Sequence, residues 1–259
     1  MRMMKKVLGT VTVLALSVSL LAGCGSTAAS PVSSAASTAA ESTTSSVVSE
    51  TTSAAADENV AAAAQLLNDL TGSYQELWPV ILADEYQQTW LDDCTALVGE
   101  ENAEAAFEKL SSMVTSDVYG EDAVEAYANG GGAYFCGFTN SLATLTFDGE
   151  TSTISGTDKD GNVLFSHTYH YIGMEPVRGL YEFQSDDADS GEFTYFFLAP
   201  DTSAETYHIE FRYGSDAEAL SQYDAGEYAY WLASGISTDC DQTMIDNCIE
   251  LFCTENLAG

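Results

Sequence analysis

The segment Val163-Leu164-Phe165-Ser166-His167-Thr168-Tyr169-His170-Tyr171-Ile172 decides the fold class of this 259-residue chain. Large apolar side chains recur at every second position between polar ones, the period typical of a half-buried β-strand. Directly before it stands Asp158-Lys159-Asp160-Gly161-Asn162, which is rich in turn-forming residues. The two together predict a hairpin turn that leads into an antiparallel strand.

That turn also has the opening composition of a calcium loop. Tyr169 stands where such a loop needs its bidentate acid, and strand patterns flank the segment on both sides. A hairpin turn is therefore the better interpretation.

Six other segments carry a strand pattern, and Gly, Asp and Pro turns separate them. With 163–172, the predicted strands are 133–139, 143–147, 151–155, 179–184, 193–198 and 206–213. Short antiparallel strands at regular spacing favour a closed or nearly closed barrel. Before Asn129-Gly130-Gly131-Gly132, apolar residues at helical spacing predict helices through 58–127, including 101–113. The tail predicts two more helices, 216–223 and 243–253, so the fold class is α+β.

The N-terminus has the pattern of an export signal. Arg2, Lys5 and Lys6 precede an apolar run over 7–21, which is shorter than a membrane-spanning helix. The next residues, Leu21-Ala22-Gly23-Cys24, match the bacterial lipobox, in which the Cys is lipidated before cleavage. We expect a signal peptide over 1–23 and a lipid on Cys24 that anchors the chain to the extracellular face of the cell membrane.

Residues 24–57 are mostly Ser, Thr and Ala, a composition that buries too little apolar surface to fold. They predict a flexible linker, which leaves 58–259 as one folded domain. Without the signal, four Lys and Arg residues stand against 40 Asp and Glu, a formal charge of −36. This charge opposes a nucleic-acid partner, and a solvated acidic surface is its simplest explanation.

Five cysteines follow Cys24, namely Cys94, Cys136, Cys240, Cys248 and Cys253. Outside the cytoplasm up to two disulfides are expected, tying the helical ends to the sheet, and their connectivity stays open. No CxxC spacing supports a structural zinc site.

Two motifs resemble a known family. They are Leu70-Thr71-Gly72-Ser73-Tyr74-Gln75-Glu76-Leu77-Trp78-Pro79, and Phe196-Phe197-Leu198-Ala199-Pro200 followed by Thr206-Tyr207-His208-Ile209. The first resembles the helical entry of the ZinT (YodA) family, which also forms the C-terminal domain of AdcA-type zinc-uptake lipoproteins. The second is similar to that family's Asp-His-x-Ile-Ala-Pro and His-Phe-His-Ile. The resemblance covers about 70–230 and implies a calycin (lipocalin-like) barrel with flanking helices, which binds zinc and delivers it to an uptake transporter.

The metal ligands of that family are only partly present. Its three zinc-binding histidines fall on Phe196, Thr206 and His208, so one imidazole remains. Strand alternation places Thr206, His208, Glu210 and Arg212 on one face. His167 and His170 lie three apart, so on a regular strand they face opposite sides and at most one can join His208.

A zinc site of His208, Glu210, water and either His167 or His170 is therefore one hypothesis. The alternative for these residues is that His208 bonds Glu210 or a Tyr inside the barrel and Arg212 pairs with Glu210 or Glu182.

The sequence leaves other functions open. The many aromatic residues of the strands would fill a small barrel, or would line a cavity for a small organic ligand. A surface interaction module without a metal site is a further alternative. No Gly-x-Ser-x-Gly, HExxH or phosphate-binding Gly loop occurs, so we do not expect an enzyme.

Overall fold

The computed structural model describes residues 58–199 and 208–258, which belong to one compact unit. The predicted signal peptide, the lipidation site Cys24, the whole predicted linker and Thr206 lie outside these described residues. No helix within the described ranges has the length and apolar character needed to cross a membrane.

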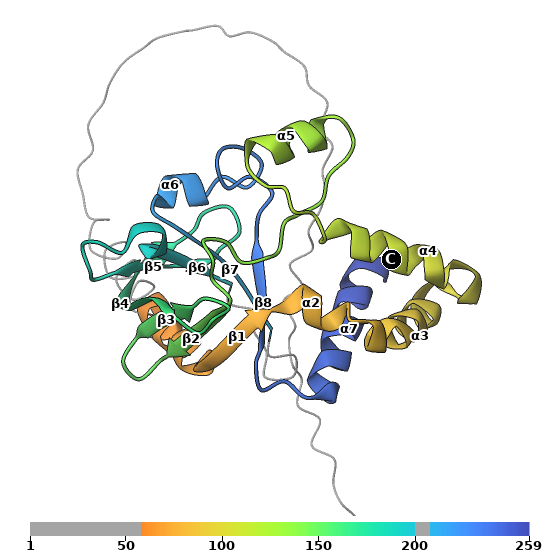
Figure 1. Cartoon of the computed structure of the whole chain (residues 1–259), viewed down its shortest axis with the longest axis horizontal. Coiled ribbons are helices and arrows are strands. Elements are labelled where there is room, and N and C mark those ends of the chain that lie inside the picture. Colours follow the sequence, from red (N-terminus) through yellow and green to blue (C-terminus); the bar gives the residue numbers. More distant parts are fainter. Residues whose placement is uncertain (1–57, 200–207, 259) are drawn as a thin grey trace, which may run out of the picture. The chain divides into compact units, whose positions relative to one another are not determined.

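Eight antiparallel strands close into a barrel in the order of the chain (Figure 1). They are β1 (Gly72–Glu76), β2 (Thr144–Asp148), β3 (Thr153–Thr157), β4 (Val163–Met174), β5 (Tyr181–Ser185), β6 (Tyr195–Leu198), β7 (His208–Gly214) and β8 (Ala233–Ser237). The barrel closes where β1 pairs with β8, with Tyr74 opposite Ser237. The expected α+β fold with a calycin-like barrel is confirmed.

Aromatic rings fill the barrel interior. Phe196 stacks on Tyr213 with ring centroids 5.4 Å apart, and Tyr213 meets Trp231 edge-on at 5.1 Å. The Tyr213 hydroxyl accepts from the Thr139 backbone N–H at 2.6 Å and donates to the Thr139 carbonyl at 2.9 Å. Burial of a phenol requires such partners, so the rings form a packed core.

The two strands that close the barrel differ from the prediction. β1 lies in a segment predicted as helix, and β8 has no predicted counterpart. β8 carries small residues, and a Cβ on its Gly235 would lie 3.1 Å from Ile209 and 3.3 Å from Phe138. Its fully buried residues show no apolar–polar alternation, which is why the period-two pattern missed it. The predicted strand 133–139 is wrong: Phe135 makes only isolated bridges, to Thr115 and Trp231.

A helix over 58–69 leads into β1 and packs on the turn after β2. Ala63, Leu66 and Leu67 are its buried residues, Leu70 directly after it is buried as well, and Val60 is exposed. A Cβ on Gly149 would lie 2.4 Å from the Asn68 Cα, so only glycine permits this approach.

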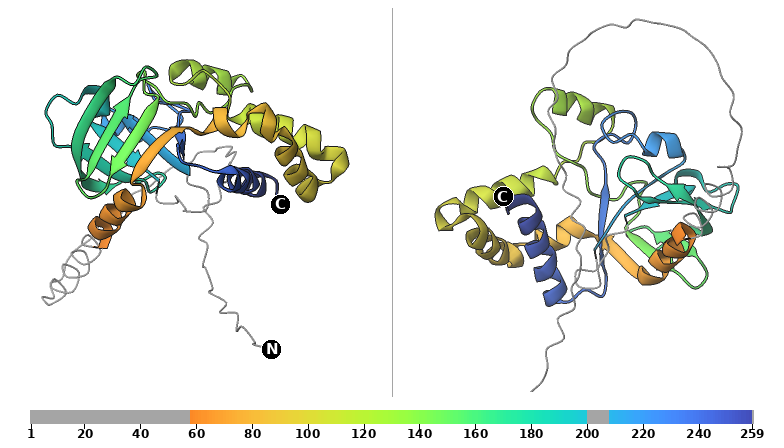
Figure 2. Two further views of the ribbon diagram at one scale, coloured as in Figure 1. Left: turned by 60° about the horizontal axis from the view of Figure 1, so that its bottom comes forward. Right: turned by 180° about the vertical axis from the view of Figure 1, so that it is seen from behind.

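A second core lies on the outer face of the barrel, where helices α2 (Leu77–Ile81), α3 (Gln87–Val98), α4 (Glu100–Met113) and α7 (Gln242–Leu257) pack together (Figure 2). Trp90 of α3 is fully buried there and donates its indole N–H to the Ile81 carbonyl at 2.7 Å. The remaining elements are short: α5 (Glu121–Ala128), α6 (Ala217–Leu220) and the 3₁₀ turns η1 (Asp84–Tyr86) and η2 (Gly191–Phe193).

The predicted hairpin turn between β3 and β4 is confirmed. The Asp158 carboxylate accepts from the backbone N–H groups of Asp160 and Asn162, both at 2.9 Å, and from the Asn162 side chain at 2.9 Å. These bonds lower the pKa of Asp158. The carboxylate is used to form the turn.

Candidate functional site

Strand β7 presents two potential metal ligands outside the barrel. Ile209 and Phe211 are buried in the barrel core, so the alternate residues His208 and Glu210 point outward. The predicted polar face of this strand is thus confirmed from residue 208 onward. Because the outer face at this point meets the helices, both side chains are only partly exposed.

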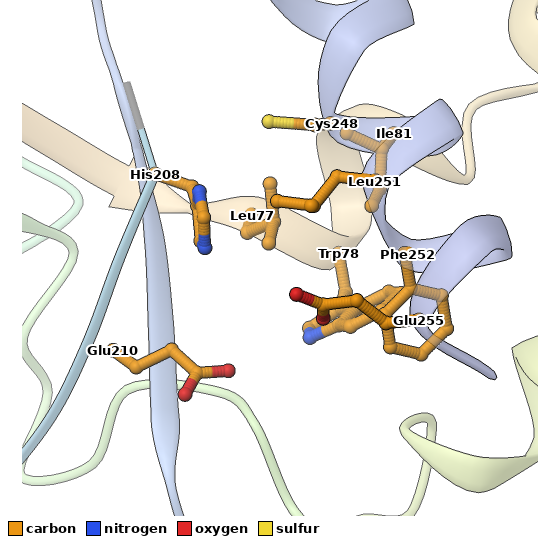
Figure 3. A pocket seen from close by; sticks show the side chains of 9 residues that line it. All are labelled: Leu77, Trp78, Ile81, His208, Glu210, Cys248, Leu251, Phe252 and Glu255. Atoms are coloured by element: carbon orange, nitrogen blue, oxygen red, sulfur yellow. The ribbon is translucent and has the colours of Figure 1, made fainter. Parts of the chain in front are cut away.

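Helix α7 supplies the opposite wall. Cys248, Leu251, Phe252 and Glu255 follow one another at intervals of three, one and three, which places them on one helical face. With Leu77, Trp78 and Ile81 of α2 they line a small pocket into which His208 and Glu210 also project (Figure 3). The cavity volume is about 40 Å³, enough for a water molecule or an ion.

Trp78 carries an unsatisfied donor at this pocket. Its ring meets Phe252 edge-on with centroids 4.7 Å apart, and only 8% of the residue is exposed. Its indole Nε1 is buried and has no acceptor within hydrogen-bond distance among the described residues, although the Cys136 thiol lies close enough to interact with it. A buried N–H without an acceptor costs free energy, so this group favours an acceptor in the pocket.

The pocket offers a buried thiol and several nitrogen and oxygen atoms as potential metal ligands. The thiol of Cys248 is 4% exposed, and burial raises its pKa to about 12, with Cys240 adding to the shift. Cys136 behaves alike, since burial first and the charge of Glu210 second raise its pKa to about 12. Thiolates are the metal-binding form, so the raised pKa of Cys248 disfavours it as a ligand, and Cys136 does not line the pocket. The nitrogen and oxygen donors His208, Glu210 and Glu255 remain.

These donors face one pocket but do not form a finished coordination sphere. Within residues 58–199 and 208–258, no three His, Cys, Asp or Glu side chains stand close enough together to hold a metal ion as placed. Figure 3 shows the carboxylates of Glu210 and Glu255 directed toward the same space, with the His208 ring nearby. Glutamates have flexible side chains, so rotamer changes alone would alter how closely these oxygens approach one another.

The other two histidines lie elsewhere. His167 lines the barrel interior beside Phe165, and its Nδ1 lies 2.7 Å from Asp187. His170 is half exposed on the outer face, with Nδ1 2.6 Å from Asp186. The prediction that they face opposite sides of the strand is confirmed, but neither lines the pocket that holds His208 and Glu210.

Phe196, the position matched to the first histidine of the family, lies on the opposite face of the sheet from His208. Phe196 is opposite Tyr213 across β6 and β7 and is fully buried inside the barrel. Cross-strand partners share a face, so a side chain at 196 points away from the face of His208. The position of the second, Thr206, lies outside the described residues.

Arg212 corrects another expectation, that it pairs with Glu210 or Glu182. It is fully buried and donates to the carbonyls of Leu220, Gln222 and Tyr228, while its guanidinium lies 4.3 Å from the centroid of the Tyr223 ring. No ion pair joins it to a carboxylate among the described residues. The guanidinium therefore holds the loop after β7, through the carbonyls of Leu220, Gln222 and Tyr228.

Several solved structures match the chain, including the following two. The crystal structure of the Zn(II)-bound ZinT-like domain of Streptococcus pneumoniae AdcA is 14% identical, with a TM-score of 0.44, and the match covers 70% of this chain and 87% of that one. The crystal structure of Zn(II)-bound AdcA from the same organism is 13% identical, with a TM-score of 0.41, over 71% and 34%. No protein-family model and no curated protein matches the chain.

The sequence predicted the pocket residues on β7 but not those on α2 and α7. It named His208 and Glu210, but Glu255, Cys248 and Trp78 were not among its candidates. The helical spacing of Cys248, Leu251, Phe252 and Glu255 was visible in the sequence. That spacing predicts a helical face but not the strand against which the helix packs.

Proposed function

We propose that this chain is a lipid-anchored extracytoplasmic protein that captures a divalent metal ion, zinc in the first instance, in the pocket between β7 and α7. The convergence of His208, Glu210 and Glu255 on one cavity carries the proposal. An imidazole nitrogen and carboxylate oxygens are ligands that Zn²⁺ accepts, and a water molecule would complete four donors.

The surroundings of the pocket support a cation. Carboxylates from two different elements, those of Glu210 and Glu255, line the same pocket, and a positive ion bound there would be attracted to both. The chain carries 40 acidic residues against seven basic ones, which raises the local concentration of cations. The Trp78 indole N–H would then donate to a ligating carboxylate or to the bound water and fix its orientation.

The role as a capturing protein rests on the N-terminal signal and on the exposure of the site. The lipobox at Cys24 would hold the domain at the outer face of the membrane, and the linker would give it reach. Glu255 is exposed at the edge of the pocket. An exposed ligand permits exchange of the ion with a partner, which we propose to be a metal-uptake transporter.

Calorimetry with zinc tests the proposal. We expect the full chain to bind one zinc ion with a dissociation constant in the micromolar range or tighter, and His208→Ala to lose that binding. An imidazole ligates only when neutral, so binding should weaken as the pH falls below about 6. His170→Ala is the matched control, because His170 bonds Asp186 away from the pocket. Equal zinc affinity of His208→Ala and the wild type would refute the proposal.

The filled barrel weighs against the alternative of a small organic ligand. Phe165, Phe183, Phe196 and Phe211 are each at most 5% exposed and belong to one continuous core. The interior positions that would line such a cavity are thus occupied by packed rings.

A further inference from the structure

Helices α3 and α7 bring two cysteines from opposite ends of the domain into contact. The Sγ atoms of Cys94 and Cys253 lie 3.9 Å apart, although 159 residues separate them in sequence. Both residues are fully buried in the helical core. Figure 2 shows α3 and α7 side by side in that core.

The remaining cysteines are placed differently. Cys136 is directed at the Tyr134 carbonyl, with its sulfur 3.9 Å from that oxygen. Cys248 lines the pocket at β7, and Cys240 is partly exposed before α7 begins. Among the described residues, Cys94 and Cys253 form the thiol pair whose sulfur atoms are in direct contact, and all five cysteines are thiols in this structure.

The same helix pair carries charges that push it apart. Asp93, next to Cys94 on α3, has a raised pKa because of burial, to which Glu250 and Asp246 of α7 add. Like charges facing each other across a helix pair destabilise it. A covalent link at this position would offset that repulsion.

We propose that Cys94 and Cys253 form an intramolecular disulfide that joins α3 to α7. The bond would hold the α7 wall of the metal pocket, because Cys253 lies on the same helix as Cys248 and Glu255. Its formation needs only a small movement, since the sulfur atoms must close from 3.9 Å to about 2.05 Å. Rotation about χ1 of either cysteine changes the sulfur position by more than this.

The chemistry is thiol–disulfide exchange with a disulfide-bearing oxidant. One cysteine thiolate attacks a sulfur of the oxidant, forms a mixed disulfide and releases one thiolate of the oxidant. The second cysteine thiolate then attacks the mixed disulfide at the protein sulfur and releases the other thiolate. Two electrons pass to the oxidant, and the two thiol protons end on its released thiols. Because both cysteines are fully buried, exchange occurs during folding or during local opening of the helices.

Peptide mapping tests the proposal without any metal. The full chain is refolded with oxidised glutathione, free thiols are alkylated, and the non-reduced digest is analysed by mass spectrometry. We expect peptides of Cys94 and Cys253 joined and both thiols lost to alkylation. Reduction should lower the unfolding temperature by on the order of 10 °C, since the bond closes a long loop.

Two variants keep the result interpretable. Cys94→Ala should abolish the linked peptide and make the unfolding temperature insensitive to reduction, whereas Cys240→Ala should leave both unchanged. Alkylation of both Cys94 and Cys253 after oxidation would overturn the proposal, and so would a dominant link between any other two cysteines. Neither outcome depends on whether the pocket binds zinc.

Discussion

Replacement of the buried arginine on the site-bearing strand tests the reasoning about β7. Arg212 lies two residues after Glu210 and is fully buried. Burial lowers its pKa from the ordinary value. In Arg212→Met an apolar side chain replaces the stem of the arginine, but the carbonyls of Leu220 and Tyr228 lose their donor.

The expected loss of stability follows from these contacts. Each charge-assisted hydrogen bond contributes about 1.5–3 kcal/mol, so the two to Leu220 and Tyr228 give about 3–6 kcal/mol. The stacking on Tyr223 adds about 2 kcal/mol. Removal of a buried charge returns several kcal/mol of desolvation. We therefore expect a net loss of about 3 kcal/mol in the free energy of unfolding.

Urea unfolding measures this loss. The midpoint should fall with an unchanged m-value. Arg178→Met is the control, since Arg178 is half-buried and donates to the Tyr134 hydroxyl at 3.0 Å. It should lose about 1–2 kcal/mol, from that hydrogen bond and from the contact of the partly exposed Arg178 with the Tyr223 ring at 4.4 Å. If Arg212→Met were as stable as the wild type, the guanidinium would not hold the loop, and the placement of β7 would need another explanation.

Three further predictions concern other parts of the molecule. Folding raises the pKa of Asp93, so the ionised carboxylate destabilises the folded chain, an effect that is absent below about pH 3.8 and grows as the pH rises. Asp93→Asn should therefore stabilise the chain by about 0.5 kcal/mol at pH 7 but not near pH 3.5. Equal effects at both pH values in thermal unfolding would contradict this. Gly149→Ala should cost about 1–3 kcal/mol in urea unfolding because its Cβ meets the helix over 58–69, whereas Gly131→Ala should stay within about 0.5 kcal/mol. Glu255→Gln should weaken zinc binding about 100-fold in calorimetry, from a loss of about 3 kcal/mol per ligand, and an unchanged affinity would exclude Glu255 as a ligand.

Local patterns were enough for the elements whose burial alternates. β4 was predicted from 163 because Phe165 and Tyr169 face the core while Ser166 and Thr168 between them face water. The turn at Asp158 was predicted because its carboxylate bonds the backbone within four residues. Helix α4 was predicted within one residue of its start, since its apolar residues recur at helical spacing.

The candidate site was predictable only on one strand. Alternation placed His208 and Glu210 on a common face, and the structure confirms it. The residues that face His208 and Glu210 could not be predicted, because the sequence gives no reason to prefer Glu255 over His167 or His170. Only the tertiary packing of α7 against β7 places Glu255 opposite these residues.

By itself, the sequence determined the class of fold, because strand alternation, turn chemistry and helical periodicity act over a few residues. It also determined the acidic character that opposes nucleic acid. Only the tertiary structure decided that β1 and β8 close the barrel, that α7 covers the outer face of β7, and that Cys94 meets Cys253. These features join segments that lie tens of positions to more than a hundred positions apart in the sequence. Their energy comes from burial and close packing between distant segments, which no local pattern records.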